Sequence, residues 1–238
     1  MSFETLKVTD VEHYTDRLFK IQCERPKTYR FTAGEFTMIG YPEDDIRRAY
    51  SITSGPYDEY LEFYSIKVQD GPLTSRLQHI QVGDLLEVGT KATGTLTLAN
   101  LELGGNLWML ATGTGIAPFI SLLRDPDTFS MFEKIHVVWS VRTMEELLAY
   151  NDILQELPID YEPIVTQDVE WPGLNKRITT AIKDGIIMTN ATPEDDKVMI
   201  CGSMPFNNDV KDMLTQNGWQ EGNKKQAGTF VQEKAFVS

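Results

Sequence analysis

Cysteine and histidine are scarce in this sequence. Its two cysteines, Cys23 and Cys201, are too few for a disulfide scaffold, an all-cysteine zinc site or an iron–sulfur cluster. None of the three histidines, His13, His79 and His136, stands at the spacing of a metal site or a catalytic triad. We therefore expect no metal, and any redox cofactor of this protein must be organic.

Long apolar runs and excess positive charge are also missing. The richest apolar stretch, residues 107–123, is interrupted by a Thr-Gly-Thr-Gly turn and by Pro118, so it cannot serve as a membrane span. The first residues lack the basic and apolar segments of a secretory signal, and we expect a cytoplasmic protein. A formal net charge of -13 and a pI near 4.7 argue against nucleic acid or a membrane as a partner, because both require a basic face.

What is present indicates two globular domains. The 238 residues, 41% of them apolar, suffice for two cores of ordinary size, and the mean hydropathy is -0.28. The first part has short segments rich in β-forming residues, separated by turn signals, which favours an antiparallel β-barrel over residues 1–103. The expected strands are 18–24, 36–41, 46–53, 60–68 and 85–90.

The pattern changes over residues 103–106, after which apolar strands alternate with helical segments. This alternation predicts an α/β, Rossmann-like domain over residues 104–238, with a parallel sheet that binds ligands beyond the carboxyl ends of its strands. Thr143 and Glu146 have the spacing of a capping box at the start of one helix. The expected strands are 107–111, 135–141, 161–166, 197–201 and 229–233, and the expected helices are 117–124, 144–157, 176–183 and 206–216.

Two segments of the first domain have chemistry suited to a nucleotide. In the strand Arg48-Ala49-Tyr50-Ser51, alternation places Arg48 and Tyr50 on one face, where they offer a cationic fork and a flat ring. An exposed arginine and a half-buried tyrosine in an ordinary sheet fit the same pattern. Residues 71–77 predict a turn into a short helix whose N–H groups could bind an anion, or a helix simply capped by Thr74.

Two segments of the second domain follow apolar strands. The glycine turn at 112–115 lies between a strand and a helix that begins near Pro118, where a pyrophosphate can approach the backbone. Cys201-Gly202-Ser203 closes another strand, so its thiol should lie at the same edge of the sheet. A plain tight turn and a buried structural cysteine remain the alternatives.

In order and spacing, these segments resemble the ferredoxin/flavodoxin–NADP+ reductase family, the bacterial subclass in particular. The shared motifs are Arg-x-Tyr-Ser, Gly-Pro-Leu-Thr-Ser, Thr-Gly-Thr-Gly-Ile-Ala-Pro-Phe, Cys-Gly-Ser and the ending Glu-Lys-Ala-Phe-Val-Ser. They cover nearly the whole chain, and five linked motifs are far more specific than any one of them.

The resemblance implies a non-covalent FAD on the barrel. Tyr50 would stack on the flavin, Arg48 and residues 73–75 would hold the pyrophosphate, and Ser51 would lie near flavin N5. Ala235 would cover the other flavin face, with Phe236 against the adenine. The full set of implied FAD contacts is Arg48, Ala49, Tyr50, Ser51, Tyr64, Ile66, Leu73, Thr74, Ser75, Thr112, Ala235 and Phe236.

The resemblance also implies NADP(H) as substrate on the second domain, with Arg142 and Arg177 clamping the 2′-phosphate. Cys201 would lie near the nicotinamide and Glu233 near the reacting centre, so Ser51, Cys201 and Glu233 are the implied catalytic residues. The implied NADP contacts are Thr112, Gly113, Thr114, Gly115, Arg142, Thr166, Arg177, Cys201, Gly202 and Asp209.

One position departs from the family pattern. Where many bacterial relatives have Val-Thr-Arg-Glu, this sequence has Val-Thr-Gln-Asp, with Gln167 in place of the arginine. Losing one charge-assisted contact would weaken discrimination against NAD by about 1.5 to 3 kcal/mol. We still expect NADP to be preferred.

The implied activity is hydride transfer between NADPH and FAD, coupled to one-electron exchange with ferredoxin or flavodoxin, by a monomer. A reductase component of an oxygenase, or a flavin-binding regulatory module of low turnover, is the alternative. Such carriers are usually acidic and this chain is acidic too, so docking would need a local basic patch. The candidates for this patch are Arg47, Lys67, Arg76 and Lys91.

Overall fold

The computed structural model describes residues 2–234, and their contacts form two compact units. The first unit comprises the residues up to Gly94 together with Ala117–Asp125. The second comprises Thr95–Ile116 and the residues from Pro126 onward. The contacts thus group 95–103 with the second unit and 117–125 with the first, whereas the predicted domain boundary after residue 103 stays a prediction. The expected residues Ala235 and Phe236 lie outside the described part of the chain.

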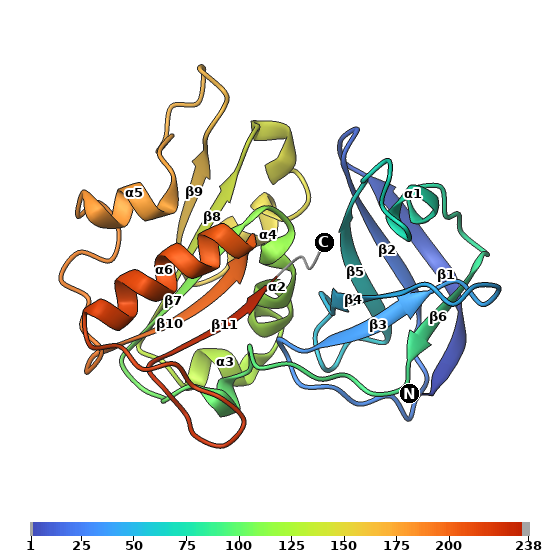
Figure 1. The fold of residues 1–238 in the computed structure, drawn as a ribbon, viewed down its shortest axis with the longest axis horizontal. Coiled ribbons are helices and arrows are strands. Elements are labelled where there is room, and N and C mark those ends of the chain that lie inside the picture. The colour runs from blue at the N-terminus through green and yellow to red at the C-terminus, as the bar shows by residue number, and fades with distance from the viewer. Residues whose placement is uncertain (1, 235–238) are drawn as a thin grey trace. The chain divides into compact units, whose positions relative to one another are not determined.

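The first unit is built on a six-stranded sheet with the strand order β4-β3-β6-β1-β2-β5, in which every pairing is antiparallel (Figure 1). Its two edges meet just after β4, where Ile52 bridges Phe63 and the Thr53 N–H donates to the Glu62 carbonyl at 2.8 Å. The sheet therefore closes almost completely, and the predicted barrel is confirmed. The strands are β1 Phe3–His13, β2 Leu18–Glu24, β3 Phe36–Gly40, β4 Arg47–Ser51, β5 Tyr60–Ile66 and β6 Leu85–Gly89.

The sequence did not predict β1, although it is the longest strand of this unit. Its register with β2 shifts between Val8 and Asp10, and only Leu6 and Val8 are fully buried along its eleven residues. The remaining positions are mostly polar and exposed, so the alternation that marks a half-buried strand is weak here.

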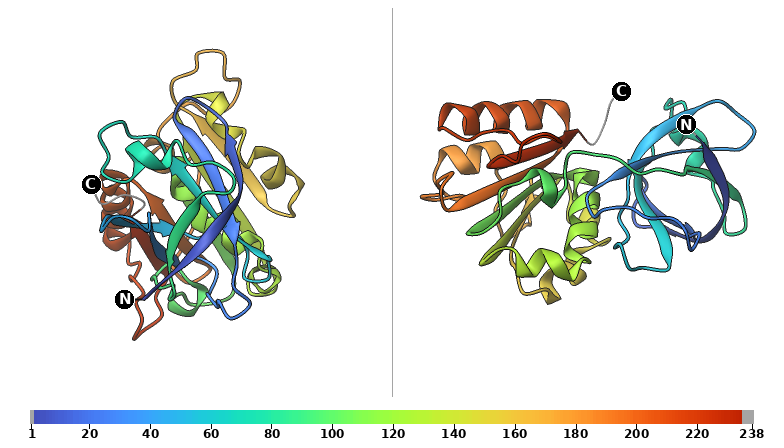
Figure 2. Two further views of the ribbon diagram at one scale, coloured as in Figure 1. Left: turned by 90° about the vertical axis from the view of Figure 1, so that its right-hand side faces the viewer. Right: turned by 90° about the horizontal axis from the view of Figure 1, so that it is seen from below.

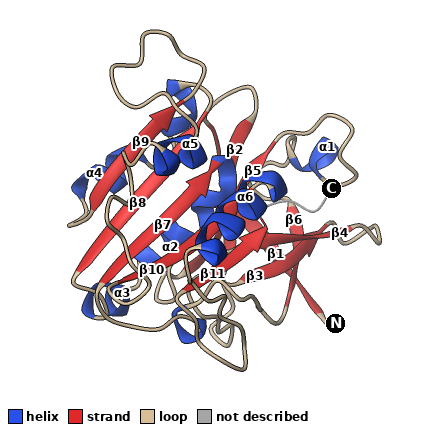
Figure 3. Cartoon of the chain, turned by 60° about the vertical axis from the view of Figure 1, so that its left-hand side comes forward, coloured by secondary structure: helices blue, strands red, loops and turns tan. Residues whose placement is uncertain are grey.

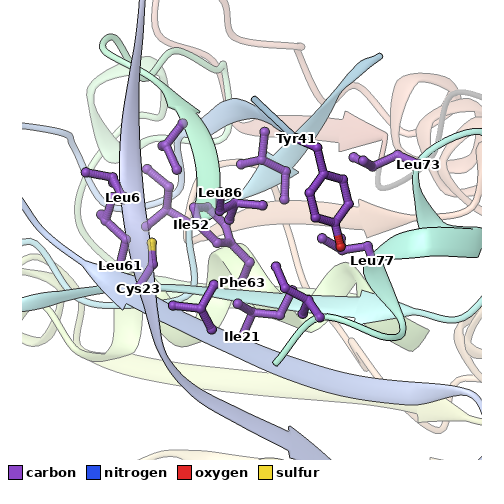
Figure 4. Close-up of a cluster of buried hydrophobic side chains, with 14 of the residues drawn as sticks. Leu6, Ile21, Cys23, Tyr41, Ile52, Leu61, Phe63, Leu73, Leu77 and Leu86 are labelled. Atoms are coloured by element: carbon purple, nitrogen blue, oxygen red, sulfur yellow. The ribbon is translucent and has the colours of Figure 1, made fainter. Parts of the chain in front are cut away.

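Alternate residues of the barrel strands point inward and form its core (Figure 4). Ile21 and Cys23 of β2 lie with Leu61 and Phe63 of β5 among side chains that are fully buried. Burying an aliphatic or aromatic side chain of this size stabilises the fold by about 1.5 to 3 kcal/mol. The short helix α1 (Thr74–Leu77) adds Leu77 to the same cluster.

Helix α2 (Ala117–Leu123) is held to the barrel by polar contacts within the first unit. The Ser121 hydroxyl donates to the Ser54 carbonyl at 2.7 Å. At the end of the helix, the Arg124 guanidinium lies 3.0 Å from the Glu62 carboxylate and also donates to the Thr53 carbonyl. Because the Glu62 side chain is only 1% exposed, Arg124 compensates a charge that would be costly to bury alone.

The second unit is an α/β domain whose five strands are all parallel, as predicted, in the order β11-β10-β7-β8-β9 (Figure 3). The chain runs outward from β7 to β9 and then returns to the other side of β7, so the strand order reverses between β7 and β10. Sheets of this kind bind ligands at such a reversal, beyond the carboxyl ends of the strands. The strands are β7 Asn106–Thr112, β8 Lys134–Val141, β9 Asp160–Val165, β10 Asp196–Gly202 and β11 Phe230–Lys234.

Helices cover this sheet on both faces. The helices α5 and α6 lie together on one face (Figure 2). On that face, Phe206 and Val210 of α6 pack with Leu110, Val138 and Ile200 of the strands. No helix within residues 2–234 is long and apolar enough to cross a bilayer. The helices are α3 Pro126–Ser130, α4 Asn151–Glu156, α5 Ile178–Lys183 and α6 Met204–Gln216, with 3-10 turns η1 Leu98–Asn100, η2 Gly113–Ile116 and η3 Met144–Leu147.

The single helix predicted for 144–157 is wrong, and so is its capping box. The chain forms the turn η3, breaks at Tyr150 and then forms α4. The Thr143 side chain makes no cap, and the Glu146 carboxylate accepts the Arg142 N–H at 2.9 Å, just after β8, in place of the Thr143 N–H. The carboxylate that the box required is therefore bound to the strand end.

We predict that Arg124→Met destabilises the protein by about 3 kcal/mol, because Glu62 keeps its burial and loses its nearest cation. A shift of the urea unfolding curve measures this loss. Lys211→Met is the control, since the Lys211–Glu221 pair is about two-fifths exposed and its removal should cost under about 1 kcal/mol. Equal effects of the two substitutions would contradict the anchoring of α2 by Glu62.

Candidate functional site

In the first unit, Tyr50 spans the gap between β4 and β5. Its hydroxyl lies 2.9 Å from the Ser65 hydroxyl, and its ring meets Phe63 edge-on with the centroids 6.4 Å apart. Burial raises the pKa of Tyr50, so the phenol stays protonated over the physiological range. The half-buried ring is thus held rigidly at the edge of the barrel where β4 and β5 approach each other.

Arg48 shares the strand face of Tyr50, as expected from alternation, and its guanidinium is exposed. It donates to the neighbouring Arg47 carbonyl at 2.8 Å and forms no ion pair with any residue in 2–234. A planar cation without a counter-charge suits a phosphate. Ala49 is exposed and Ser51 half-buried on the same strand.

The segment that leads into α1 has a different local structure from simple helix capping. The N-cap is Leu73, which is buried, and the Thr74 hydroxyl donates backward to the Val68 carbonyl at 3.2 Å. The Ser75 N–H donates to the Gly71 carbonyl at 3.0 Å. Capping by Thr74 is therefore wrong, because its hydroxyl closes the preceding turn.

Tyr64 and Ile66 do not join Tyr50 in these contacts. They alternate along β5 with Phe63 and Ser65, so they belong to the other face of that strand. The Tyr64 ring instead meets Tyr14 edge-on, with the centroids 6.3 Å apart. Their role beside a flavin stays a prediction.

In the second unit, four residues form one row across the carboxyl edge of the sheet. The parallel register pairs Trp139 with Ala111, Ala111 with Cys201, and Cys201 with Glu233. The Cys201 side chain is fully buried, and burial together with the nearby Glu233 carboxylate raises the pKa of its thiol. The thiol thus lies at the same edge as the glycine turn, as predicted.

The turn η2 packs directly on β10. A Cβ on Gly115 would lie 2.2 Å from the Cys201 carbonyl oxygen, and one on Gly202 would lie 2.2 Å from the Thr112 hydroxyl. Both positions therefore require glycine for close approach. The Ser203 N–H also lies 3.3 Å from the Thr112 hydroxyl, so the two motifs read from the sequence meet at the strand reversal.

Glu233 is held by residues that sequence reasoning missed. Its carboxylate accepts the Thr95 N–H at 3.1 Å, and its backbone carbonyl accepts the side-chain amide of the fully buried Asn207 at 2.8 Å. Burial raises the pKa of the Glu233 carboxyl, and the Thr95 N–H opposes that shift. Neither Thr95 nor Asn207 stands in a motif, so no local signal pointed to them.

Of the residues expected near the 2′-phosphate, Arg142 and Thr166 lie on neighbouring strand ends, whereas Arg177 forms no hydrogen bond or ion pair with them in residues 2–234. Both the N–H and the hydroxyl of Thr166 donate to the Val141 carbonyl at 3.1 Å, and the Gln167 N–H donates to the Arg142 carbonyl at 2.9 Å. The end of β9 therefore lies against the end of β8. Arg142 is exposed and forms no ion pair within residues 2–234.

Arg177 and Asp209 are not brought into contact with the glycine turn by any hydrogen bond or ion pair observed in residues 2–234. Arg177 is the exposed N-cap of α5, and Asp209 is exposed on α6. Their contact with a nucleotide stays a prediction.

The two arginines of the expected basic patch are already neutralised. Arg47 is ion-paired with Asp44 and Glu87, and Arg76 is ion-paired with Glu43 and Asp44. A cation held by carboxylates contributes little attraction to an acidic partner. The predicted patch loses these two members, because Glu43 and Asp44 in the loop after β3 and Glu87 in β6 form ion pairs with them.

Known proteins resemble this chain both in part and along its whole length. Residues 109–212 match the model of the oxidoreductase NAD-binding domain. Across 97% of its length the chain is 44% identical to a flavodoxin/ferredoxin–NADP reductase of Rhodobacter capsulatus, covering 92% of it. It is 39% identical to a ferredoxin–NADP reductase of Azotobacter vinelandii, covering 97% of this chain and 96% of that one.

A solved structure is similar to this chain over the whole fold. The ferredoxin NADP+ reductase of Neisseria gonorrhoeae, with bound FAD and NADP, has a TM-score of 0.92 and 33% identity, covering 99% of this chain and all of that one. The chain belongs to the flavodoxin/ferredoxin–NADP reductase family.

We predict that neither cysteine reacts with a thiol reagent such as DTNB in the folded protein at pH 8. Both thiols are fully buried, and burial raises the pKa of Cys23 to about 12 and that of Cys201 as well, which depletes the reactive thiolate. Unfolding in guanidinium should release both thiols. Rapid labelling of folded Cys23→Ser, which retains only Cys201, would show that the thiol is accessible.

Proposed function

We propose that this protein is an FAD-dependent oxidoreductase that exchanges electrons between NADP(H) and ferredoxin or flavodoxin. The observation that carries the proposal is the end-to-end similarity to reductases named for this reaction. The meeting of the glycine turn with Cys201 and Gly202 at the strand reversal supports it independently, because that is where an α/β sheet binds a nucleotide.

We assign FAD to the edge of the barrel formed by β4. Arg48 offers a guanidinium without an ion pair in residues 2–234, beside the rigidly held ring of Tyr50, and this pair fits a diphosphate and a flat ring system. When bound, FAD supplies an acceptor that takes two electrons together and releases them singly. The other residues assigned to it are Ala49, Ser51, Tyr64, Ile66, Leu73, Thr74, Ser75, Thr112, Ala235 and Phe236.

We assign the nicotinamide nucleotide to the carboxyl edge of the second unit's sheet. The backbone of residues 112–115 would receive the pyrophosphate, and the exposed guanidinium of Arg142 would receive the 2′-phosphate with help from Arg177. Thr166, Gly202 and Asp209 complete the proposed set. Arginine suits this dianion because its charge does not titrate.

The three proposed catalytic residues would act in different ways. Cys201 would pack near the nicotinamide. Because its raised pKa keeps the thiol neutral, it would not act as a nucleophile. Because its pKa is raised, the Glu233 carboxyl is protonated more readily than an exposed carboxyl is. Ser51 would donate a hydrogen bond near the flavin.

The alternatives keep the same fold and differ in partner or turnover. A reductase component of an oxygenase would reduce FAD with the nucleotide and pass electrons to another enzyme. A regulatory module would bind flavin and turn over little nucleotide. The monomeric state and the cytoplasmic location remain proposals.

We expect the purified protein to bind FAD and to lose its yellow flavin absorbance on anaerobic addition of NADPH. NADH should do so more slowly at equal concentration, because it lacks the phosphate that Arg142 would bind. Stopped-flow absorbance measures both rates. A flavin that stays yellow with NADPH would support the regulatory module and overturn the proposed reaction.

We predict that Gln167→Arg raises the preference for NADPH over NADH by about tenfold to a hundredfold in kcat/KM. The added guanidinium restores one charge-assisted contact with the 2′-phosphate, worth about 1.5 to 3 kcal/mol. The Gln167 N–H to Arg142 bond is made by the backbone and should survive the change. Gln167→Met, of similar length and uncharged, is the control, and an equal shift in it would contradict the assignment.

A further inference from the structure

Trp139 makes a contact that none of the motifs includes. It lies in β8, is fully buried, and is among the largest side chains in the described interior. Its indole Nε1–H donates to the Gly113 carbonyl at 2.8 Å. A buried indole N–H needs an acceptor, and here the acceptor is the first residue of the turn η2.

Gly113 has the backbone conformation that makes this carbonyl important. Its φ is +54°, in the left-handed region, while a Cβ there would meet nothing within 4 Å. The glycine is therefore required for the conformation and not for space. Glycine reaches this conformation without steric cost, and the indole N–H of Trp139 is a side-chain contact that holds the Gly113 carbonyl in it.

The same peptide unit contains the N–H of Thr114. A trans peptide is planar, so its C=O and N–H point in opposite directions. With the Gly113 carbonyl directed at the buried indole, the Thr114 N–H must point away from Trp139. Trp139 thereby sets the direction of a backbone donor in the turn that we assign to the pyrophosphate.

The turn is anchored on both sides of β7. On the β10 side, Gly115 packs against the backbone carbonyl of Cys201. On the β8 side, Trp139 provides the anchor with its side chain. A substitution can therefore remove the second anchor and leave the first intact.

We propose that Trp139 is a positioning residue for the nicotinamide nucleotide, fixing the Gly113–Thr114 peptide so that the Thr114 N–H is presented to a phosphate oxygen. This inference rests on the proposed function. It adds a specific donor, Thr114 N–H, and the side chain that orients it.

Two substitutions separate the hydrogen bond from packing. Trp139→Phe and Trp139→His each replace the two-ring indole by a single ring, so both lose volume beside Tyr150, whose ring centroid is 6.4 Å away. Histidine can place Nε2–H where the indole N–H lies, and its imidazole is neutral at pH 8. Phenylalanine has no donor.

The measurement is calorimetric titration of the FAD-loaded full-length proteins with NADP+ at pH 8. Trp139→Phe should bind about fivefold to tenfold more weakly than Trp139→His, as expected for one oriented hydrogen bond. Under saturating NADPH the rate of flavin reduction should be similar in the two variants, because the effect lies in binding. Thermal unfolding of both variants checks that they lose similar stability.

Equal NADP+ affinities of the two variants would overturn the inference and assign Trp139 to packing alone. If the unmodified protein reduces its flavin with NADPH but the two variants do not differ, only this inference falls. If the unmodified protein does not bind NADP+, the proposed function falls with it.

Should Trp139→Phe fail to fold, the unmodified protein still provides a test by NMR. In the unmodified protein, the indole N–H resonance of Trp139 should shift on addition of NADP+ by more than the indole N–H resonances of Trp171 and Trp219. An unchanged Trp139 resonance at saturating NADP+ would overturn the inference.

Discussion

The backbone contact between Gly115 and the Cys201 carbonyl is the constraint on which the carboxyl edge of the second unit depends. The turn after β7 lies so close to the end of β10 that no Cβ would fit at Gly115. That contact brings together two segments nearly ninety residues apart in the chain, and it exists only because the strand order reverses between β7 and β10. The contact fixes the turn η2 relative to Cys201, and the pairing of β10 with β11 places Glu233 beside Cys201.

Around that contact, the polar groups are held by neighbours outside the motifs. Trp139 orients the Gly113 carbonyl, Thr95 holds the Glu233 carboxylate, and Asn207 holds the Glu233 backbone. Burying an amide or an indole N–H is favourable only when it finds a partner. These hydrogen bonds therefore rigidify the edge of the sheet, which is the preorganisation that binding a flexible nucleotide requires.

Some arginines of this acidic protein are paired with carboxylates and others are not. In the first unit, Glu62 is buried and compensated by Arg124, while Arg47 and Arg76 are occupied by nearby carboxylates. The exposed cations Arg48 and Arg142 form no ion pairs within residues 2–234. An acidic protein that leaves these particular cations uncompensated is suited to binding anionic phosphates while repelling other polyanions.

The sequence by itself determined the class of each unit and the location of its chemical groups. Short segments rich in β-formers and separated by turn signals predicted the barrel, and strand–helix alternation predicted the parallel sheet. The turns at 112–115 and 201–203 were placed at one edge because parallel strands end there. It missed β1, whose polar surface hides its alternation. It also joined η3 and α4 into one helix, because the competing donor to the Glu146 carboxylate, the Arg142 N–H, lies just after another element, β8. Only the tertiary structure decided that Arg47 and Arg76 are neutralised, that Tyr64 and Tyr50 contact different residues, and that Trp139 meets Gly113. Apart from the Arg47–Asp44 pair, these contacts join residues distant in sequence, and local pattern contains no information on which distant group a side chain will reach.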